Sequence, residues 1–325
     1  MRGSILFAMR RILFFLAVLA GVASAQDYPT KPVRLIVPYA AGGLPDTMSR
    51  LVAPKLADAL GQQLLVENRP GAGGISGTEA VAKAAPDGYT LLIADVGQLA
   101  INPHIFSKLP YDALKDLAPV SLLGTSTLFL VLHASVPANT FQELVALAKA
   151  KPGSLNYGSS GLGSIHHVTT EAFKQAFGLD IVHVPYKGMG QAVPALLGGQ
   201  VSMVFSALPA VEGHVQGGKV KLVALSTPRR SAQAPQVPTI AELGAPGFDF
   251  APQIGMLAPA GTPQAIVQRL SAEVARAVRL PDVSQRFQSL GIDPSGSSPQ
   301  EYAASIRNDY ERYGKVVRSS GIRVE

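Results

Sequence analysis

The segment from Val33 to Gly61 constrains the fold more than any other part of the chain. It begins with a short apolar run, Val33 to Val37, which is typical of a strand buried on both faces of a parallel sheet. A turn with two adjacent glycines, Gly42 and Gly43, leads into a helical pattern that ends at Gly61. Such a turn directs backbone N–H groups and the positive end of the helix dipole at one point, which favours an anion. The spacing fits neither a P-loop nor a dinucleotide-binding motif, so the turn alone leaves open whether it binds a ligand or only connects two elements.

The first 25 residues have the pattern of a secretory signal peptide. Three arginines precede an apolar run over residues 12–20, and Ala23-Ser24-Ala25 offers a cleavage site. The run is too short to span a bilayer. We therefore expect cleavage after Ala25 and export of the remaining chain to the periplasm, with residues 1–25 as the signal peptide.

Composition excludes several classes of function. The chain has no cysteine, so disulfides, thiol catalysis and cysteine metal sites are absent. Its six histidines show no metal-ligand spacing, so we expect no metal and no cofactor. Without the three leader arginines, 25 of the 28 basic residues remain against 22 acidic ones, and they form no cluster. A nucleic-acid partner is therefore not expected.

Strand and helix patterns alternate after Gly61, with short turns between them. Apolar runs typical of strands occupy residues 64–67, 89–94, 128–132, 155–157, 181–184, 201–205, 221–225 and 254–258. This alternation predicts right-handed strand-helix-strand units, parallel pairing and an α/β fold with two doubly wound sheets.

The chain is long enough for two domains, and the order of its elements indicates two crossings between them. We expect the chain to cross near residues 123–127 and again between residues 226 and 255. Domain 1 would then comprise residues 26–125 and 253–325, and domain 2 residues 126–252. A double crossover of this kind predicts a hinge between two lobes.

A second turn rich in glycine and serine follows the strand at 155–157. It spans residues 158–164, and further turns follow other strands at 95–98 and 185–188. In open α/β sheets, ligands gather outside the carboxyl ends of the strands, so the turns at 39–43 and 95–98 should face one crevice, and the second domain should have a crevice of its own. Hydroxyl and amide groups at such a place suit the binding of an oxyanion.

Two residues near these turns admit competing interpretations. Ser160 could be a nucleophile with His166 or His167 as its base, but a leucine at position 162 breaks the G-x-S-x-G pattern, and no acidic residue is placed to orient either histidine. Asp46, near the start of the first helix, either complements the helix dipole or orients a ligand or water.

The chain resembles the substrate-binding proteins of the tripartite tricarboxylate transporters, also called the Bordetella uptake gene family. The resemblance covers the whole mature chain and is carried by a series of blocks: Val37–Gly43 with Asp46, Glu67–Gly74, Pro86–Thr90, Ala100–Pro103, Leu109–Asp112, Asn156–Gly161, Val184–Gly188, Leu196–Val201 and Leu257–Pro263. It implies a two-lobed periplasmic binding protein that closes over a small carboxylate like a flytrap. It also implies that the function is not enzymatic and that the chain, expected as a monomer, delivers its ligand to the permease subunits in the membrane.

The resemblance further implies the binding residues. The turns at 39–43 and 159–164 would grip one carboxylate, and the turns at 97–98 and 186–188 would help to line the cleft. Relatives often carry an acidic residue after the strand at 201–205, suited to pairing with a ligand amine, but here Ser206 stands there. We therefore expect a di- or tricarboxylate or an aromatic acid. A periplasmic sensory module for a carboxylate, or a serine-dependent hydrolase, remains an alternative. The expected ligand-binding residues are Tyr39, Ala41, Gly42, Gly43, Asp46, Gly97, Gln98, Ser159, Ser160, Gly161, Gly163, Ser164, Tyr186, Lys187, Gly188 and Ser206.

Overall fold

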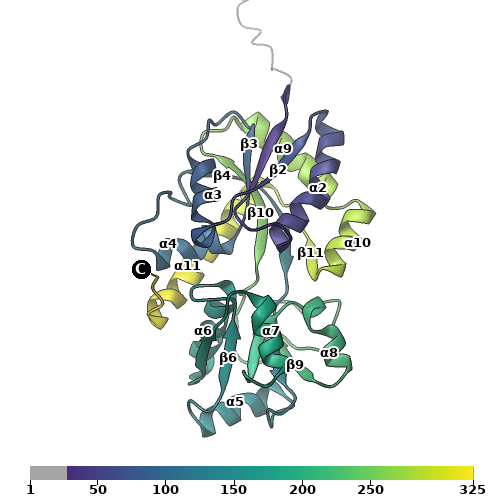
Figure 1. Cartoon of the computed structure of the whole chain (residues 1–325). Coiled ribbons are helices and arrows are strands. Elements are labelled where there is room, and N and C mark those ends of the chain that lie inside the picture. The colour runs from purple at the N-terminus through teal and green to yellow at the C-terminus, as the bar shows by residue number, and fades with distance from the viewer. Residues whose placement is uncertain (1–27, 325) are drawn as a thin grey trace, which may run out of the picture.

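The computed structural model describes residues 28–324, so the expected signal peptide and its cleavage site lie outside the described residues. The described chain forms two α/β lobes that are joined by extended segments (Figure 1). Within residues 28–324, no helix combines the length and the apolar character needed to cross a membrane.

The first lobe is built on a six-stranded sheet with the order β11-β4-β10-β3-β1-β2. Its strands are β1 (Val33–Val37), β2 (Leu64–Asn68), β3 (Thr90–Asp95), β4 (Leu117–Ser126), β10 (Gln253–Pro259) and β11 (Ile292–Pro294). Its helical elements are α2 (Leu44–Leu60), η1 (Ala72–Gly74), α3 (Ile75–Ala82), the π-helical turn η2 (Gly97–Ile101), α4 (Asn102–Ile105), α9 (Gln264–Ala277), α10 (Pro281–Ser289) and α11 (Pro299–Ser320).

The second lobe is built on a five-stranded sheet with the order β7-β6-β8-β5-β9. Its strands are β5 (Phe129–His133), β6 (Asn156–Ser159), β7 (Val182–Pro185), β8 (Met203–Ser206) and β9 (Val220–Leu225). Its helical elements are α5 (Phe141–Ala150), α6 (Ile165–Phe177), α7 (Met189–Leu197), η3 (Leu208–Ala210) and α8 (Glu212–Gln216).

Both sheets are mixed, which corrects the expectation of purely parallel pairing. In the first sheet, β1 is parallel to β2 and β3, whereas β10 is antiparallel to β3 and to β4. In the second, β6 is parallel to β7 and β8, whereas β5 is antiparallel to β8 and β9. Strands β5 and β10 each come directly after a crossing between the lobes and enter their sheets from the opposite end, and β11 also pairs antiparallel with β4.

Three other features of the local structure were not expected from the sequence. Helix α3 begins at Ile75, because the glycine turn η1 leads directly into it. The expected turn at 95–98 continues as η2 and α4. Strands β4 and β11 were not predicted at all. Prolines and polar residues interrupt the apolar pattern in both, and the pairing with neighbouring strands decides their conformation.

The first sheet is covered by helices on both faces, which explains its continuous apolar strands. In β1, Leu35 packs with residues of α2, α9 and α10, whereas Ile36 packs with α3 and the first half of α11. Successive side chains of a strand point to opposite faces, so both faces require apolar residues.

Helix α2 confirms the interpretation of the segment that constrains the fold. Gly43 is its extended N-cap, and Gly61 ends it in the left-handed conformation with φ of 71°. This conformation is costly for a residue with a Cβ, which explains the glycine at the end of the helix.

Helix α11 contacts both lobes. Ser298 and Glu301 form a capping box at its start, and Tyr302 packs on the first sheet. The second half of the helix contributes Tyr313 to the core of the second lobe, where its ring lies 5.1 Å from that of Phe250. The expected domain boundaries, which place all of residues 253–325 in domain 1, remain a prediction about which residues move together.

The packing of α11 on β10 generates a prediction about stability. A Cβ at Gly255 would overlap the ring of Tyr302, which is 1% exposed and cannot move into solvent. We expect Gly255→Ala to lower the free energy of unfolding by about 1–3 kcal/mol, the usual cost of overpacking a core. Urea denaturation would measure the change. Gly213→Ala is the matched control, because a Cβ there meets no atom within 4 Å. Equal stabilities of the two variants would contradict this account of the packing.

Candidate functional site

A cavity of about 560 Å³ lies between the two lobes. The first lobe contributes the ends of β1 and β3 with η2 and α4, and the second contributes the β6–α6 connection and the start of α6. Six of the expected binding residues line the cavity: Tyr39, Gly97, Gln98, Ser160, Gly163 and Ser164. It is also lined by Gly73, Asp95, Asn102, Ile105, Phe106, Leu162, Ile165, His166 and Val324.

The other ten expected residues lie outside the described lining of this cavity. They are Ala41, Gly42, Gly43, Asp46, Ser159, Gly161, Tyr186, Lys187, Gly188 and Ser206. Their contact with a ligand remains a prediction.

Asp46 organises the turn after β1. Its carboxylate is only 2% exposed and accepts hydrogen bonds from the backbone N–H of Gly42 at 2.9 Å, from Arg50 Nε at 3.0 Å and from Asn68 Nδ2 at 2.9 Å. Burial would raise the pKa of this carboxyl, but these hydrogen bonds lower it below its usual value. Because Asn68 also donates to the carbonyl of Tyr39 at 3.1 Å, this network holds Tyr39 at the cavity wall.

The turn at Tyr186–Gly188 lies behind the β6–α6 connection. The N–H of Tyr186 donates to the carbonyl of Ser159 at 3.1 Å, and Gly161 is packed against the carbonyl of Tyr186. Ser206, at the end of β8, is 2% exposed, and its hydroxyl donates to the carbonyl of Ala207 at 3.4 Å. These groups support the cavity wall from outside its described lining.

The wall formed by the first lobe is a connected hydrogen-bond network. Tyr39 donates its hydroxyl hydrogen to Asp95 Oδ2 at 2.8 Å, and Gly97 N–H donates to Asp95 Oδ1 at 2.7 Å. Gln98 Nε2 donates to the Tyr39 oxygen at 2.8 Å and to the carbonyl of Gly73 at 3.0 Å. Burial raises the pKa of Asp95, against the lowering effect of the hydrogen bonds from Tyr39 and Gly97. Both amide hydrogens of Gln98 and the hydroxyl hydrogen of Tyr39 are thus used within the wall.

The wall formed by the second lobe has the opposite character. Helix α6 begins here, with the Ser164 hydroxyl as its cap, accepting from His167 N–H at 3.3 Å. The N–H groups of Ile165 and His166 belong to the first turn, which has no intrahelical acceptors for them. Together with the positive end of the helix dipole and the hydroxyl of Ser160, they make this wall a donor surface suited to a carboxylate.

Two buried histidines hold the β6–α6 connection from behind. His167 Nδ1 accepts from the N–H of Gly163 at 3.0 Å, and His183 Nε2 lies 2.7 Å from the hydroxyl oxygen of Ser159. Their rings are stacked with centroids 3.9 Å apart. Burial, with repulsion from His183 and Lys174, lowers the pKa of His167 to about 3. These rings therefore fix the connection as neutral groups.

Ser160 and His166 form a second serine-histidine contact, and this one lies in the lining of the cavity. The Ser160 hydroxyl oxygen lies 2.8 Å from His166 Nδ1, and burial lowers the pKa of His166 to about 4. Within residues 28–324, His166 forms no ion pair or hydrogen bond with a carboxylate that would orient it as a base.

Sequence reasoning missed several residues of the lining. Asp95 had a usable signal, because it ends a buried strand in the turn that was expected to face the crevice. His166 was considered only as a base. Val324 gave no signal, because it lies more than 200 positions after the other first-lobe residues of the lining. Its backbone N–H donates to the carbonyl of Ile105 at 3.0 Å, and this contact holds it at the cavity.

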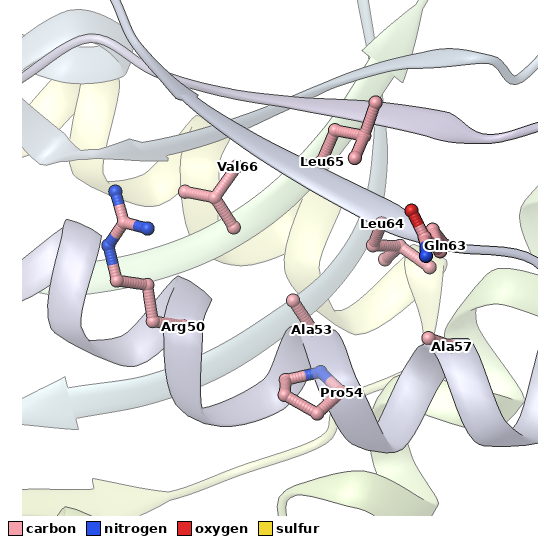
Figure 2. Close-up of a pocket in the computed structure, with 8 residues that line it drawn as sticks. All are labelled: Arg50, Ala53, Pro54, Ala57, Gln63, Leu64, Leu65 and Val66. Carbon is pink, nitrogen blue, oxygen red and sulfur yellow. The ribbon is translucent and has the colours of Figure 1, made fainter.

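Other candidate sites are poor. In residues 28–324, no group of three or more acidic or histidine side chains could hold a metal ion. A second depression, of about 420 Å³, lies between α2 and β2 (Figure 2). Its lining is Arg50, Ala53, Pro54, Ala57, Gln63, Leu64, Leu65 and Val66, in which Arg50 and Gln63 are the only polar side chains. It lacks the converging donors of the cavity between the lobes.

The buried histidines generate a prediction about pH. The pKa of His167 is about 3 in the folded chain and near 6.5 when unfolded, so its contribution to stability is complete above pH 6.5 and is lost as the pH falls toward 3. Between pH 7 and pH 5, this residue alone should cost about 2 kcal/mol of unfolding free energy. Urea denaturation at several pH values would measure it.

His167→Asn is the informative comparison for this pH dependence. Its side-chain oxygen can still accept from Gly163 N–H but does not titrate in this range. We expect the variant to lose about 2 kcal/mol less between pH 7 and pH 5 than the natural chain. Parallel losses in the two proteins would show that His167 is not held neutral.

The chain is similar to known proteins over nearly its whole length. Residues 48–322 match the model of the tripartite tricarboxylate transporter family receptor. The chain is 38% identical to protein BugT of Bordetella pertussis over 98% of both chains. It is 34% identical to a protein encoded in the tcbD-tcbE intergenic region of a Pseudomonas species, over 92% of this chain and 93% of that one.

Solved structures agree with these sequence relatives. A structure described as a periplasmic transporter is 39% identical, covers 92% of this chain and 100% of its own, and has a TM-score of 0.78. A Rhodopseudomonas palustris protein with adipate is 34% identical over 91% of this chain and 99% of its own, with a TM-score of 0.79. MatC of the same species, with bound malate, is 33% identical over 89% of this chain and 100% of its own, with a TM-score of 0.75.

The family model and the relatives agree with the resemblance inferred from the sequence motifs and with the two-lobed architecture. The chain belongs to the receptor family of the tripartite tricarboxylate transporters, whose members are periplasmic solute-binding proteins.

Proposed function

We propose that this protein captures a small organic carboxylate in the cavity between its lobes and delivers it to the permease of a tripartite tricarboxylate transporter in the membrane. The observation that carries the proposal is the wall at the start of α6, where N–H groups that lack intrahelical acceptors and the hydroxyls of Ser160 and Ser164 lie at the cavity. Such donors hold a small anion without a cationic side chain, and a carboxylate is an anion of this kind. Export to the periplasm after removal of the leader follows from the same role.

The relatives support a carboxylate ligand. Adipate and malate, which are both dicarboxylates, are bound in two of the similar structures. Their fold matches this chain over about nine-tenths of its length, which supports binding of a carboxylate between the lobes here as well. The name of the family supports delivery to a permease.

We also propose that ligand binding closes the lobes about the two connections between the sheets. Closure would move domain 2, residues 126–252, against residues 26–125 and 253–325. Donors of the α6 wall and groups of the first lobe then contact the ligand together only in the closed state, and the ligand stabilises that state. Some of the expected binding residues outside the cavity lining, such as Lys187, would then approach the ligand only on closure.

The proposed role does not involve catalysis. The Ser160–His166 pair lacks an orienting carboxylate in the described chain, so it should not activate the hydroxyl. We expect no turnover of p-nitrophenyl esters of acetate or succinate above the rate in buffer, measured by release of the chromophore. A turnover that Ser160→Ala abolishes would replace this proposal with a serine hydrolase.

The binding role generates a second prediction, on Ser160→Leu. The larger apolar side chain would remove a hydroxyl and fill part of the cavity, so we expect the thermal shift caused by carboxylates to disappear. For the natural chain, a ligand at about a hundred times its dissociation constant adds about 2.7 kcal/mol of stability. The screen would cover aliphatic di- and tricarboxylates, aromatic acids and amino acids.

Ser154→Leu is the matched control for this variant. Ser154 is exposed on the second lobe, and its hydroxyl donates to the carbonyl of Lys151 outside the cavity. It should retain the full ligand-induced shift, and both variants should melt close to the natural chain without ligand. A carboxylate that shifts Ser160→Leu as much as the natural chain would place the ligand elsewhere.

A further inference from the structure

The charge of the cavity points to a narrower class of ligand. Asp95 is the only acidic side chain in its described lining, and no Lys or Arg lies among those residues. Asp95 also takes part in none of the ion pairs within residues 28–324. The hydrogen bonds to its carboxylate come from two neutral groups, the Tyr39 hydroxyl and the Gly97 N–H.

The side chains of Tyr39 and Gln98, which lie next to Asp95, have no free hydrogens to offer a ligand carboxylate. The hydroxyl hydrogen of Tyr39 is directed at Asp95, and the two amide hydrogens of Gln98 go to Tyr39 and to the carbonyl of Gly73. Asn102 Nδ2 also donates to that carbonyl, at 3.0 Å. Apart from the second amide hydrogen of Asn102, the side chains around Asp95 therefore present acceptors and a negative charge. Each carboxylate oxygen of Asp95 keeps lone pairs for one further donor.

The opposite wall has the reverse polarity. The first turn of α6 offers the N–H groups of Ile165 and His166, and Ser160 and Ser164 add hydroxyls. A ligand in this cavity is thus oriented by its own charges, with an anionic end toward α6 and a donor or cationic end toward Asp95.

A dicarboxylate fits this arrangement poorly. Its second carboxylate would lie on the side of Asp95 with no cation between them, and like charges in a partly buried site repel strongly. An ammonium group in the same place would form an ion pair with Asp95 and could donate up to three hydrogen bonds. Burial disfavours the charged form of Asp95 and raises the pKa of its carboxyl. A cation beside it would stabilise the charged form and so offset this cost of burial.

We propose that Asp95 determines specificity and that the ligand is an aminocarboxylate, with its carboxylate at the start of α6 and its ammonium group at Asp95. This inference rests on the proposed function, because it assigns the ligand class of the same cavity. It revises the expectation drawn from Ser206, which excluded an amine because the end of β8 carries no acid. Here the acid stands at the end of β3, in the other lobe.

The test compares ligands of equal length that differ only at one end. Isothermal titration calorimetry and thermal shift would be measured with γ-aminobutanoate against succinate, δ-aminopentanoate against glutarate, and ε-aminohexanoate against adipate. Aspartate against malate tests an ammonium group placed near the carboxylate. We expect at least one aminocarboxylate to bind about tenfold or more tightly than its dicarboxylate partner.

The variant Asp95→Asn removes the charge and keeps the shape of the side chain. We expect it to weaken binding of the preferred aminocarboxylate by about tenfold or more, and to leave binding of the paired dicarboxylate equal or stronger. Asp58→Asn, on the exposed surface of α2 in the same lobe, is the control with the same change in net charge and should alter neither affinity. The melting temperature without ligand shows that each variant is folded.

The outcomes separate the two proposals. Preference for an aminocarboxylate that Asp95→Asn abolishes supports the assignment. Binding of dicarboxylates alone, unchanged or strengthened in Asp95→Asn, overturns the role of Asp95 and leaves carboxylate capture intact. Should the natural chain bind no carboxylate of either kind, both this inference and the proposed function fail. The preference in the natural chain decides the question even if Asp95→Asn does not fold.

Discussion

The antiparallel pairing of β4 with β10 is the interaction on which the rest of the molecule depends. These strands carry the chain from the first sheet toward the second and back again, and they pair from Leu117↔Pro259 to Thr125↔Gln253. The two connections between the lobes are thereby held side by side, as Figure 1 shows. Strand β10 also pairs with β3, and Ile254 lies opposite Asp95. Asp95 at the cavity is therefore held directly by the strand through which the chain returns from the second lobe.

The site achieves polarity with little formal charge. On one side, a helix start and hydroxyls act as donors, and the histidines behind them remain neutral because burial disfavours their protonation. On the other side, a single carboxylate is held by neutral donors. Backbone dipoles fixed by secondary structure need no reorganisation when a ligand arrives, whereas flexible lysines would have to be ordered. The cavity is therefore pre-organised by its fold more than by its ionisable side chains.

The sequence predicted the architecture better than the site. Glycines at helix ends, capping boxes and apolar runs located most elements, because local preferences and the tertiary fold agree there. Strands β4 and β11 were not predicted, because their conformation depends on pairing with strands that are distant in the sequence. At the site, glycine-rich turns located the cavity, but they could not show that the hydrogens of Tyr39 and Gln98 are consumed by neighbours. Which donors remain free depends on distances between segments that no local pattern encodes.

The position of the chain end has a practical consequence. Val324 lines the cavity and bridges to Phe106, so the last described residue sits at the rim of the binding site. A purification tag or fused protein attached there would crowd the entrance, whereas the purple beginning of the described chain lies at the far end of the first lobe (Figure 1). The same geometry is useful for a biosensor. Because the chain has no cysteine, a single introduced thiol near this rim would accept a fluorescent dye at one site only, and the dye would report occupancy through its changed surroundings.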